Sequence, residues 1–250
     1  MTWRRRIAGW LRNALLFLEE PAAFRALLSW PKFSLTSYRM LADLRRQGIA
    51  PASIIDVGAN TGQFAVTARF LYPDAEIIAF EPNEGAFQEL KRHLGRMRGV
   101  ELRRMALGDT VGTLEFRLNA DNRSSSILPI GKAHLDAFPD AREVGVERVP
   151  VSTLDQELKT LQLAEPCLLK LDVQGYESSV LEGARKTLKR VQFVVLETSF
   201  SPLYEGERPF TEMLGMMSEM GYEFLRPIGY LSHPKSGEIL QMDALFMSRK

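Results

Sequence analysis

The sequence predicts an α/β fold built on a doubly wound, mostly parallel sheet. Short apolar runs typical of buried parallel strands alternate with amphipathic helical segments over about 190 residues. A glycine-bearing turn follows the first of these strands, where such sheets bind ligands. The chain has 250 residues, of which 45% are hydrophobic and 25% charged, so it is long enough for one such domain with added segments.

Residues 1–49 are expected to form a helical N-terminal extension. Apolar residues recur at helical spacing within residues 3–29, and three arginines stand at positions 4–6. This basic start can bring the helix to an anionic membrane surface, or the helix can cap the domain or a second subunit, which we favour. A further helix is predicted over about residues 35–47, with Gly48 as its C-terminal stop.

Strands and helices are expected to alternate from residue 50 to residue 250. The predicted strands cover residues 54–57, 76–80, 100–106, 168–171, 193–196 and 244–247. One helix is predicted to begin at about Gly62, and later helices carry Phe87, Tyr176 and Phe210. An insertion at about residues 111–151 breaks the pattern, with strands predicted over 112–118 and 147–151 and a polar loop between them. Such an insertion usually forms an edge hairpin or a lid near a site.

Composition excludes several classes of protein. The net charge of +1 offers no electrostatic footprint for nucleic acid, so no nucleic-acid partner is expected. The single cysteine, Cys167, cannot form an internal disulfide, and its apolar neighbours predict a buried strand residue in a cytoplasmic protein. No segment reaches the roughly 18 continuous apolar residues that a membrane span needs. Contact with the inner membrane face would therefore be peripheral.

The strongest local signal is the turn Asp56-Val57-Gly58-Ala59-Asn60-Thr61-Gly62, at a junction from strand to helix. Gly58 can adopt backbone angles that other residues resist and lets a ligand approach, while Gly62 lets the next helix start close to the sheet. Asn60 stands where a dinucleotide-binding motif has its second glycine, which weakens a pyrophosphate-binding interpretation. Asp56 adds a carboxylate, so the turn favours a cationic sulfonium cofactor.

Glu81 ends the second predicted strand in Phe80-Glu81-Pro82. It follows Gly62 by about 20 residues, the spacing at which a carboxylate binds the ribose hydroxyls of a nucleoside. The alternative is a solvated charge at a strand end. Two carboxylates at successive strand ends that flank a glycine turn make the nucleoside site the stronger hypothesis.

Asp172 and Glu197 end two later strands and are the first candidates for catalysis. A carboxylate at this edge can take a proton from a hydroxyl or hold a divalent ion, although Asp172 can also simply cap the next helix. Two carboxylates are too few to predict a metal site. His134, in the inserted polar loop, is a third candidate base, with an ordinary solvated histidine as the alternative.

Taken together, these motifs resemble the FkbM family of S-adenosylmethionine-dependent methyltransferases over roughly residues 50–248. The resemblance rests on Asp56–Gly62, Phe80–Pro82, Ala106–Asp109, Ser124–Ser126, Val151–Asp155, Lys170–Glu177, Glu197 and Asp243–Phe246 in this order. One departure stands out, because the family usually has Asp-Val-Glu-Gly where this chain has Asp172-Val173-Gln174-Gly175. Glutamine keeps the shape of glutamate and loses its charge.

The resemblance implies a Rossmann-like class I methyltransferase fold and O-methylation of sugars or other hydroxyl-bearing natural products. By position, it implies that S-adenosylmethionine is bound by Gly58, Asn60, Gly62 and Glu81, with Asp56 beside the methionine moiety and Asp109 near the adenine. It also implies that Asp172, Glu197 and His134 face the acceptor.

Other readings of the sequence stay open. An NAD-linked oxidoreductase is disfavoured by Asn60, whereas Gln174 leaves room for a non-catalytic binding protein with the same fold. N-methylation is a further alternative, because an amine acceptor needs less help from a base. Acceptor specificity is expected to lie in the insertion and the N-terminal helices, and a homo-oligomer is left open.

Overall fold

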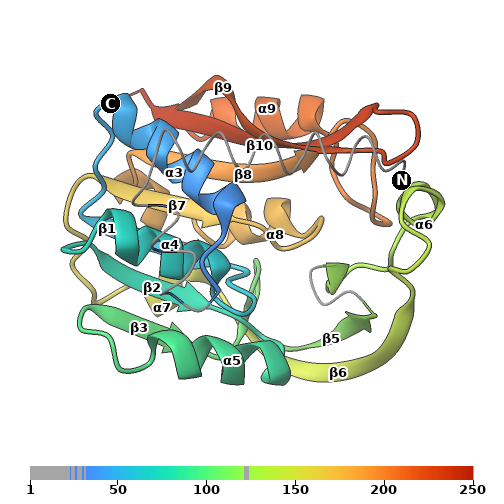
Figure 1. Ribbon diagram of the computed structural model, residues 1–250, viewed down its shortest axis with the longest axis horizontal. Coiled ribbons are helices and arrows are strands. Elements are labelled where there is room, and N and C mark those ends of the chain that lie inside the picture. Colours follow the sequence, from blue (N-terminus) through green and yellow to red (C-terminus); the bar gives the residue numbers. More distant parts are fainter. Residues whose placement is uncertain (1–22, 24–25, 27–29, 31, 121–123, 250) are drawn as a thin grey trace.

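The computed structural model describes residues 23, 26, 30, 32–120 and 124–249 and is organised around one large sheet (Figure 1). The strands of this sheet lie in the order β3 (Val100–Arg103), β2 (Glu76–Phe80), β1 (Ser53–Val57), β7 (Cys167–Leu171), β8 (Phe193–Ser199), β10 (Ile239–Ser248) and β9 (Tyr222–Ser232). β1, β2, β3, β7 and β8 pair in parallel, whereas β10 is antiparallel to both its neighbours. The predicted doubly wound, mostly parallel sheet is confirmed.

The chain reverses its winding direction between β1 and β7. From β1 it builds outwards through β2 to β3, and it then returns to place β7 on the other side of β1. Every residue of β1 and of β7 is buried, which explains why both sequences are continuous apolar runs with isolated charges. Such a reversal leaves a crevice at the carboxyl ends of the two central strands.

Three helices, α3 (Leu35–Arg46), α4 (Gln63–Leu71) and α5 (Glu84–Leu94), cover one face of the sheet and lie in front of it in Figure 1. Their buried side chains share a cluster with Ile54 of β1 and Leu168 of β7. Leu41 and Leu44 of α3 are fully buried there, so this helix belongs to the main core. Ser34 caps α3 and Gly48 follows it with φ 77°, which confirms the predicted helix and its stop.

The other face packs against α7 (Leu154–Glu157), α8 (Glu177–Glu182) and α9 (Phe210–Glu219). Alternate residues of each strand serve the two faces: Ile55 and Leu169 point to this second cluster, while their neighbours Ile54 and Leu168 belong to the first. The helix predicted over residues 176–188 is interrupted, because α8 ends at Glu182 and a separate 3₁₀ turn covers Thr187–Arg190.

The insertion forms a second, three-stranded sheet, with β6 (Glu143–Ser152) between β4 (Ala106–Leu107) and β5 (Gly112–Asn119). The predicted hairpin of β5 and β6 is therefore confirmed. The prediction of a single strand over residues 100–106 is wrong. The chain leaves the large sheet after Arg103 and enters the small one at Ala106. A short helix, α6 (Lys132–Ala137), replaces part of the expected polar loop.

The sequence did not predict β9, the edge strand. It carries charged Glu223 and Arg226 and a central Pro227, and its polar and apolar residues alternate poorly. An edge strand tolerates this because it needs neither two apolar faces nor a hydrogen-bond partner in the sheet for every backbone N–H group. The predicted helices within residues 3–29, and with them the proposed membrane contact, fall almost wholly outside the described residues. Within the described part of the chain, no helix is long and apolar enough to cross a membrane.

Candidate active site

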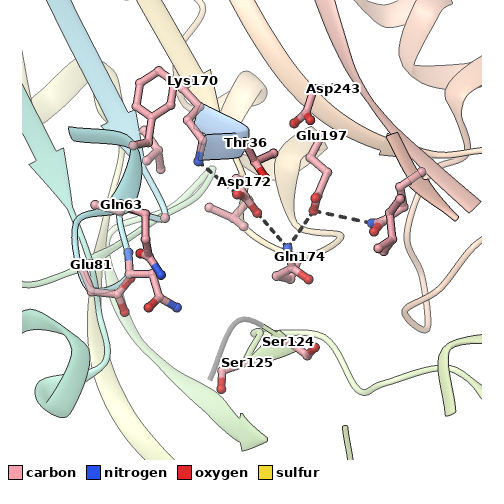
Figure 2. A pocket seen from close by; sticks show the side chains of 18 of the residues that line it. Thr36, Gln63, Glu81, Ser124, Ser125, Lys170, Asp172, Gln174, Glu197 and Asp243 are labelled. Atoms are coloured by element: carbon pink, nitrogen blue, oxygen red, sulfur yellow. Dashed lines mark hydrogen bonds and ion pairs between the residues drawn. The ribbon is translucent and has the colours of Figure 1, made fainter. Parts of the chain in front are cut away.

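A cavity of about 720 Å³ opens at the carboxyl ends of the parallel strands. Its inner wall comes from the ends of β1, β2, β7 and β8, and the start of α3 contributes Thr36. The outer wall comes from the small sheet, the segment around α6 and the β9–β10 hairpin. Figure 2 shows Glu81 on one side of this pocket and Asp172, Gln174 and Glu197 on the other. The cavity thus joins two of the predicted groups of site residues.

Gly58 begins the turn after β1, with φ 82°. A Cβ atom here would lie 1.9 Å from the backbone oxygen of Asp172, so the glycine is needed because the end of β7 packs against it. Gly58 also lines the cavity, so close approach of a ligand to its backbone stays a prediction. Gly62, with φ 97°, starts α4 and does not line the cavity, and a Cβ there would meet Leu90 of α5 at 2.9 Å.

Glu81 lies at the cavity end of β2 and is buried. Its two carboxylate oxygens accept hydrogen bonds from the backbone N–H groups of Asn60, at 2.7 Å, and Asn83, at 2.8 Å. Burial raises the pKa of Glu81 to about 7, and the two backbone donors oppose this rise only in part. The turn and the second strand are therefore joined at the residue predicted to bind a nucleoside. Asn60 itself has φ 49° and turns its side-chain oxygen back to the N–H of Thr61.

Asp56 is fully buried and does not line the cavity, which is at odds with the position implied for it beside the cofactor. Its carboxylate faces the ammonium group of Lys170, with 3.5 Å between Oδ1 and Nζ. Lys170 also binds Asp172, at 3.0 Å, and lies over the Phe64 ring. Burial works against the charge of Lys170, but the two carboxylates outweigh it and raise the pKa of this lysine. The ion pair with Asp56 therefore fixes the position of Lys170, and the ion pair with Lys170 fixes the carboxylate of Asp172, which lines the cavity.

Gln174 connects the two predicted catalytic carboxylates. Its side-chain nitrogen donates hydrogen bonds to Asp172 Oδ1, at 2.7 Å, and to Glu197 Oε2, at 2.6 Å (Figure 2). Its side-chain oxygen accepts one from the hydroxyl of buried Tyr204, at 2.7 Å, which fixes the amide with its nitrogen toward the carboxylates. An ionised glutamate could not donate these bonds. The departure from the family pattern is thus the centre of a hydrogen-bond network.

The carboxyl groups of this network differ in proton affinity. Burial tends to raise the pKa of Asp172, but the charge of Lys170 and the hydrogen bonds from Lys170 and Gln174 hold it below its ordinary value. Burial and the nearby charges of Asp172 and Asp243 raise the pKa of Glu197 well above its ordinary value. Asp243 pairs with Glu197 across β8 and β10, and burial raises its pKa to about 6. Asp172 therefore loses its proton at a lower pH than Glu197 does, and it is ionised at neutral pH.

His134 lines the cavity but is neither solvated nor in a loop. It belongs to α6, is buried, and packs its ring against Phe138 and Tyr204. Its Nε2 lies 3.4 Å from the hydroxyl of Ser124. The serine stretch also anchors the insertion to the segment that follows β7, because Ser126 donates a hydrogen bond to the backbone oxygen of Gln174 at 2.6 Å. His134 thus stands on the outer wall, beyond the contacts that link Asp172 and Glu197.

Asp109, which the resemblance places near an adenine, is exposed and does not line the cavity. Beside Glu81 the wall is instead apolar and consists of Met105, Ala106 and Leu107, with Phe116 of β5. The switch of the chain from the large sheet to the small one produces this wall. Its sequence carries no charged marker, and the position of Asp109 near an adenine rested on the family resemblance alone.

Lys170, Tyr204, Asp243 and Gln241 were not predicted as site residues. Lys170 stands two residues before Asp172 and on the same face of its strand, a signal that the sequence contains. Asp243 is an isolated charge in an apolar strand. Tyr204 and Gln241 offer no local signal, because only the tertiary fold brings them to Gln174 and Glu197. In the described part of the chain, no group of three or more His, Cys, Asp or Glu residues is arranged to hold a metal ion.

Comparison with known proteins places this site in a family. The sequence pattern described as the methyltransferase FkbM domain matches residues 56–224, which is more than half of the chain and includes Glu81, Asp172, Gln174 and Glu197. The chain belongs to the FkbM methyltransferase family. Membership confirms the recognition made from the motifs, and it confirms S-adenosylmethionine as the expected cofactor.

FkbM relatives with assigned names include 2-O-methyltransferase NoeI of Sinorhizobium fredii, 29% identical over 193 residues, or 75% of this chain and 79% of that protein. Hexuronic acid methyltransferase AglP of Haloferax volcanii is 28% identical over 142 residues, covering 57% of this chain and 54% of that protein. Among solved structures, Thermoplasma acidophilum protein 1320 superposes with a TM-score of 0.50 at 11% identity, over 92% of this chain and 97% of that one. This last likeness concerns the fold alone.

Proposed function

We propose that this FkbM methyltransferase transfers the methyl group of S-adenosylmethionine to a hydroxyl group of a sugar. The observation that carries the proposal is one continuous cavity with Glu81 at one end and the Asp172–Gln174–Glu197 network at the other. The names of two relatives support the same chemistry, since one is a 2-O-methyltransferase and the other a hexuronic acid methyltransferase.

The residues of the first end fit the cofactor. Glu81 keeps free lone pairs beside its two backbone donors, so its carboxylate can accept hydrogen bonds from the two hydroxyls of a ribose. The apolar wall of Met105, Ala106 and Leu107 suits the faces of a purine. Among the described lining residues Lys170 is the one lysine or arginine, and Asp56 and Asp172 already engage it, which suits a sulfonium cation better than the pyrophosphate of NAD.

At the other end, Asp172 is the group that receives the acceptor proton. When bound, the cofactor supplies an electrophilic methyl group, and the acceptor oxygen becomes strongly acidic as its bond to carbon forms. Ionised Asp172 accepts a hydrogen bond from the acceptor hydroxyl, orients one of its lone pairs, and takes its proton late in the transfer. Gln174 and Lys170 hold the carboxylate in place, and much of the acceleration comes from this positioning. An amine acceptor would need no such base, which favours O-methylation over N-methylation.

The acceptor enters between the β9–β10 hairpin and the segment after α6. Tyr230 and Pro234 of the hairpin line the cavity, as do Phe138 and Pro139 after α6. Tyr230 remains 58% exposed, so its ring is available to a ligand. Aromatic and proline rings present flat apolar surfaces on which the C–H faces of a sugar can pack.

Calorimetric titration with S-adenosylhomocysteine, with NAD as the control ligand, tests the first half of the proposal. We expect binding of the former alone. Methyl transfer to a panel of simple glycosides tests the second half, and Asp172→Asn is expected to lower kcat by about 10²-fold or more while the affinity for S-adenosylhomocysteine is unchanged. NAD binding, or an Asp172→Asn variant with wild-type turnover, would overturn the respective half.

A further inference from the structure

The end of the cavity where methyl transfer takes place is acidic. Asp172, Glu197 and Asp243 all line it, and Figure 2 shows the latter two on neighbouring strands above Gln174. Asp243 also lies against the backbone of Gly229, where even a Cβ atom would come within 2.1 Å of its carboxylate, so β9 closes the wall behind it. A ligand at this end therefore meets carboxyl groups and amides.

The ammonium group of Lys170, near these carboxylates, is already paired with acids. Lys170 is the one lysine or arginine among the described residues that line the cavity, and it is bound by Asp56 on one side and Asp172 on the other. His134 lies on the opposite wall, where Ser124 and the rings of Phe138 and Tyr204 surround it. Asp140, an exposed residue among those that line the cavity, is again an acid.

An anionic acceptor would bring its charge into this environment. A carboxylate or phosphate next to the reacting hydroxyl would lose its hydration on entering a largely buried site. Among the described residues that line the cavity, it would find like charges and no free lysine or arginine. A sugar whose polar groups are all hydroxyls meets hydrogen-bond acceptors in Asp172 and Asp243 and a side-chain amide in Gln241. The same carboxylates favour a cationic cofactor.

We infer that the reacting sugar of the acceptor is uncharged, so that this site discriminates against uronic acids and sugar phosphates. The inference rests on the proposed function and specifies its substrate class. It also separates this chain from AglP, the relative that is named for a hexuronic acid.

Matched pairs of acceptors test the inference, for example methyl glucoside with methyl glucuronide and methyl galactoside with methyl galacturonide. The two members of each pair differ only in a hydroxymethyl group against a carboxylate. We expect kcat/KM, followed by release of S-adenosylhomocysteine, to be at least about tenfold higher for the neutral member of every pair that is methylated. Asp243→Asn is expected to narrow this ratio several-fold. Asp74 is an exposed acid between α4 and β2, at the opposite end of the strands from the cavity. Asp74→Asn should therefore leave the ratio unchanged.

Equal or higher kcat/KM for a uronate would overturn the inference, and so would a ratio that Asp243→Asn does not alter. If S-adenosylhomocysteine binds but no pair is methylated, the assignment of an uncharged sugar is wrong while the cofactor site stands. If S-adenosylhomocysteine does not bind, the proposed function itself fails, and this inference falls with it.

Discussion

Gln174 has more influence on the site than its neutral side chain suggests. One amide nitrogen satisfies two carboxylates from different strands, while Tyr204 fixes the orientation of the amide. Its backbone has φ 58°, and its backbone oxygen accepts a hydrogen bond from Ser126. The residue therefore links β7, β8 and the insertion. It also allows Asp172 to stay ionised beside Glu197 without a second charge between them.

At the scale of this residue we predict the effect of Gln174→Glu. The new carboxylate would raise the pKa of Asp172 by like-charge repulsion and by loss of a donor, so the acidic limb of the pH profile of kcat/KM should move to higher pH. At neutral pH we expect a loss of about 10²-fold in kcat/KM. Steady-state rates between pH 5 and 9 would measure both effects.

Tyr204→Phe is the matched control for this variant, because it removes a hydrogen bond to the same amide without adding charge. It should lower kcat modestly and leave the acidic limb in place. An unshifted limb in Gln174→Glu, with unchanged affinity for S-adenosylhomocysteine, would show that the amide does not control the protonation of the pair.

Among the elements, the turn between β1 and α4 depends on the end of β7. Gly58 adopts φ 82°, and a Cβ there would overlap the backbone oxygen of Asp172. Gly206 offers a close comparison, since its φ is 85° but its surroundings are open within 4 Å. The two positions share the backbone strain of a left-handed residue and differ in packing.

We therefore predict that Gly58→Ala lowers the free energy of unfolding by about 3 kcal/mol or more, whereas Gly206→Ala costs about 1 kcal/mol. Gly58→Ala should also reduce methyl transfer, since the backbone of Asp172 must move to make room. Urea denaturation of both variants measures the difference. Equal losses would mean that the close approach of β1 and β7 is not maintained.

For the molecule as a whole, α3 is part of the folding unit although the family match begins only at residue 56. Leu41 of α3 is fully buried in the same cluster as Leu168 of β7. Asp43 of α3 also forms an ion pair with Arg226 of β9, at 2.5 Å. The start of this helix lines the cofactor cavity, so stability and binding both depend on its packing.

Leu41→Ala is accordingly expected to destabilise the whole protein by about 2–5 kcal/mol, as much as Leu168→Ala in the central sheet. Both variants should unfold in one transition, with coincident curves from circular dichroism and tryptophan fluorescence. If Leu41→Ala instead produced a separate early transition, α3 would be an appended element and not a layer of the core.

The sequence by itself determined the class of the fold, the places of most parallel strands along the chain and the turn from Asp56 to Gly62, because these depend on local periodicity and backbone requirements. It also placed Glu81, Asp172 and Glu197 at strand ends, where topology alone brings them to one edge. Tertiary structure decided which polar groups meet: Gln174 with Tyr204, Lys170 with Asp56, and Asp243 with Glu197. It also exposed Asp109 and buried His134. Such pairings join residues far apart in the chain, and burial then sets their charges, so no local pattern of residues encodes them.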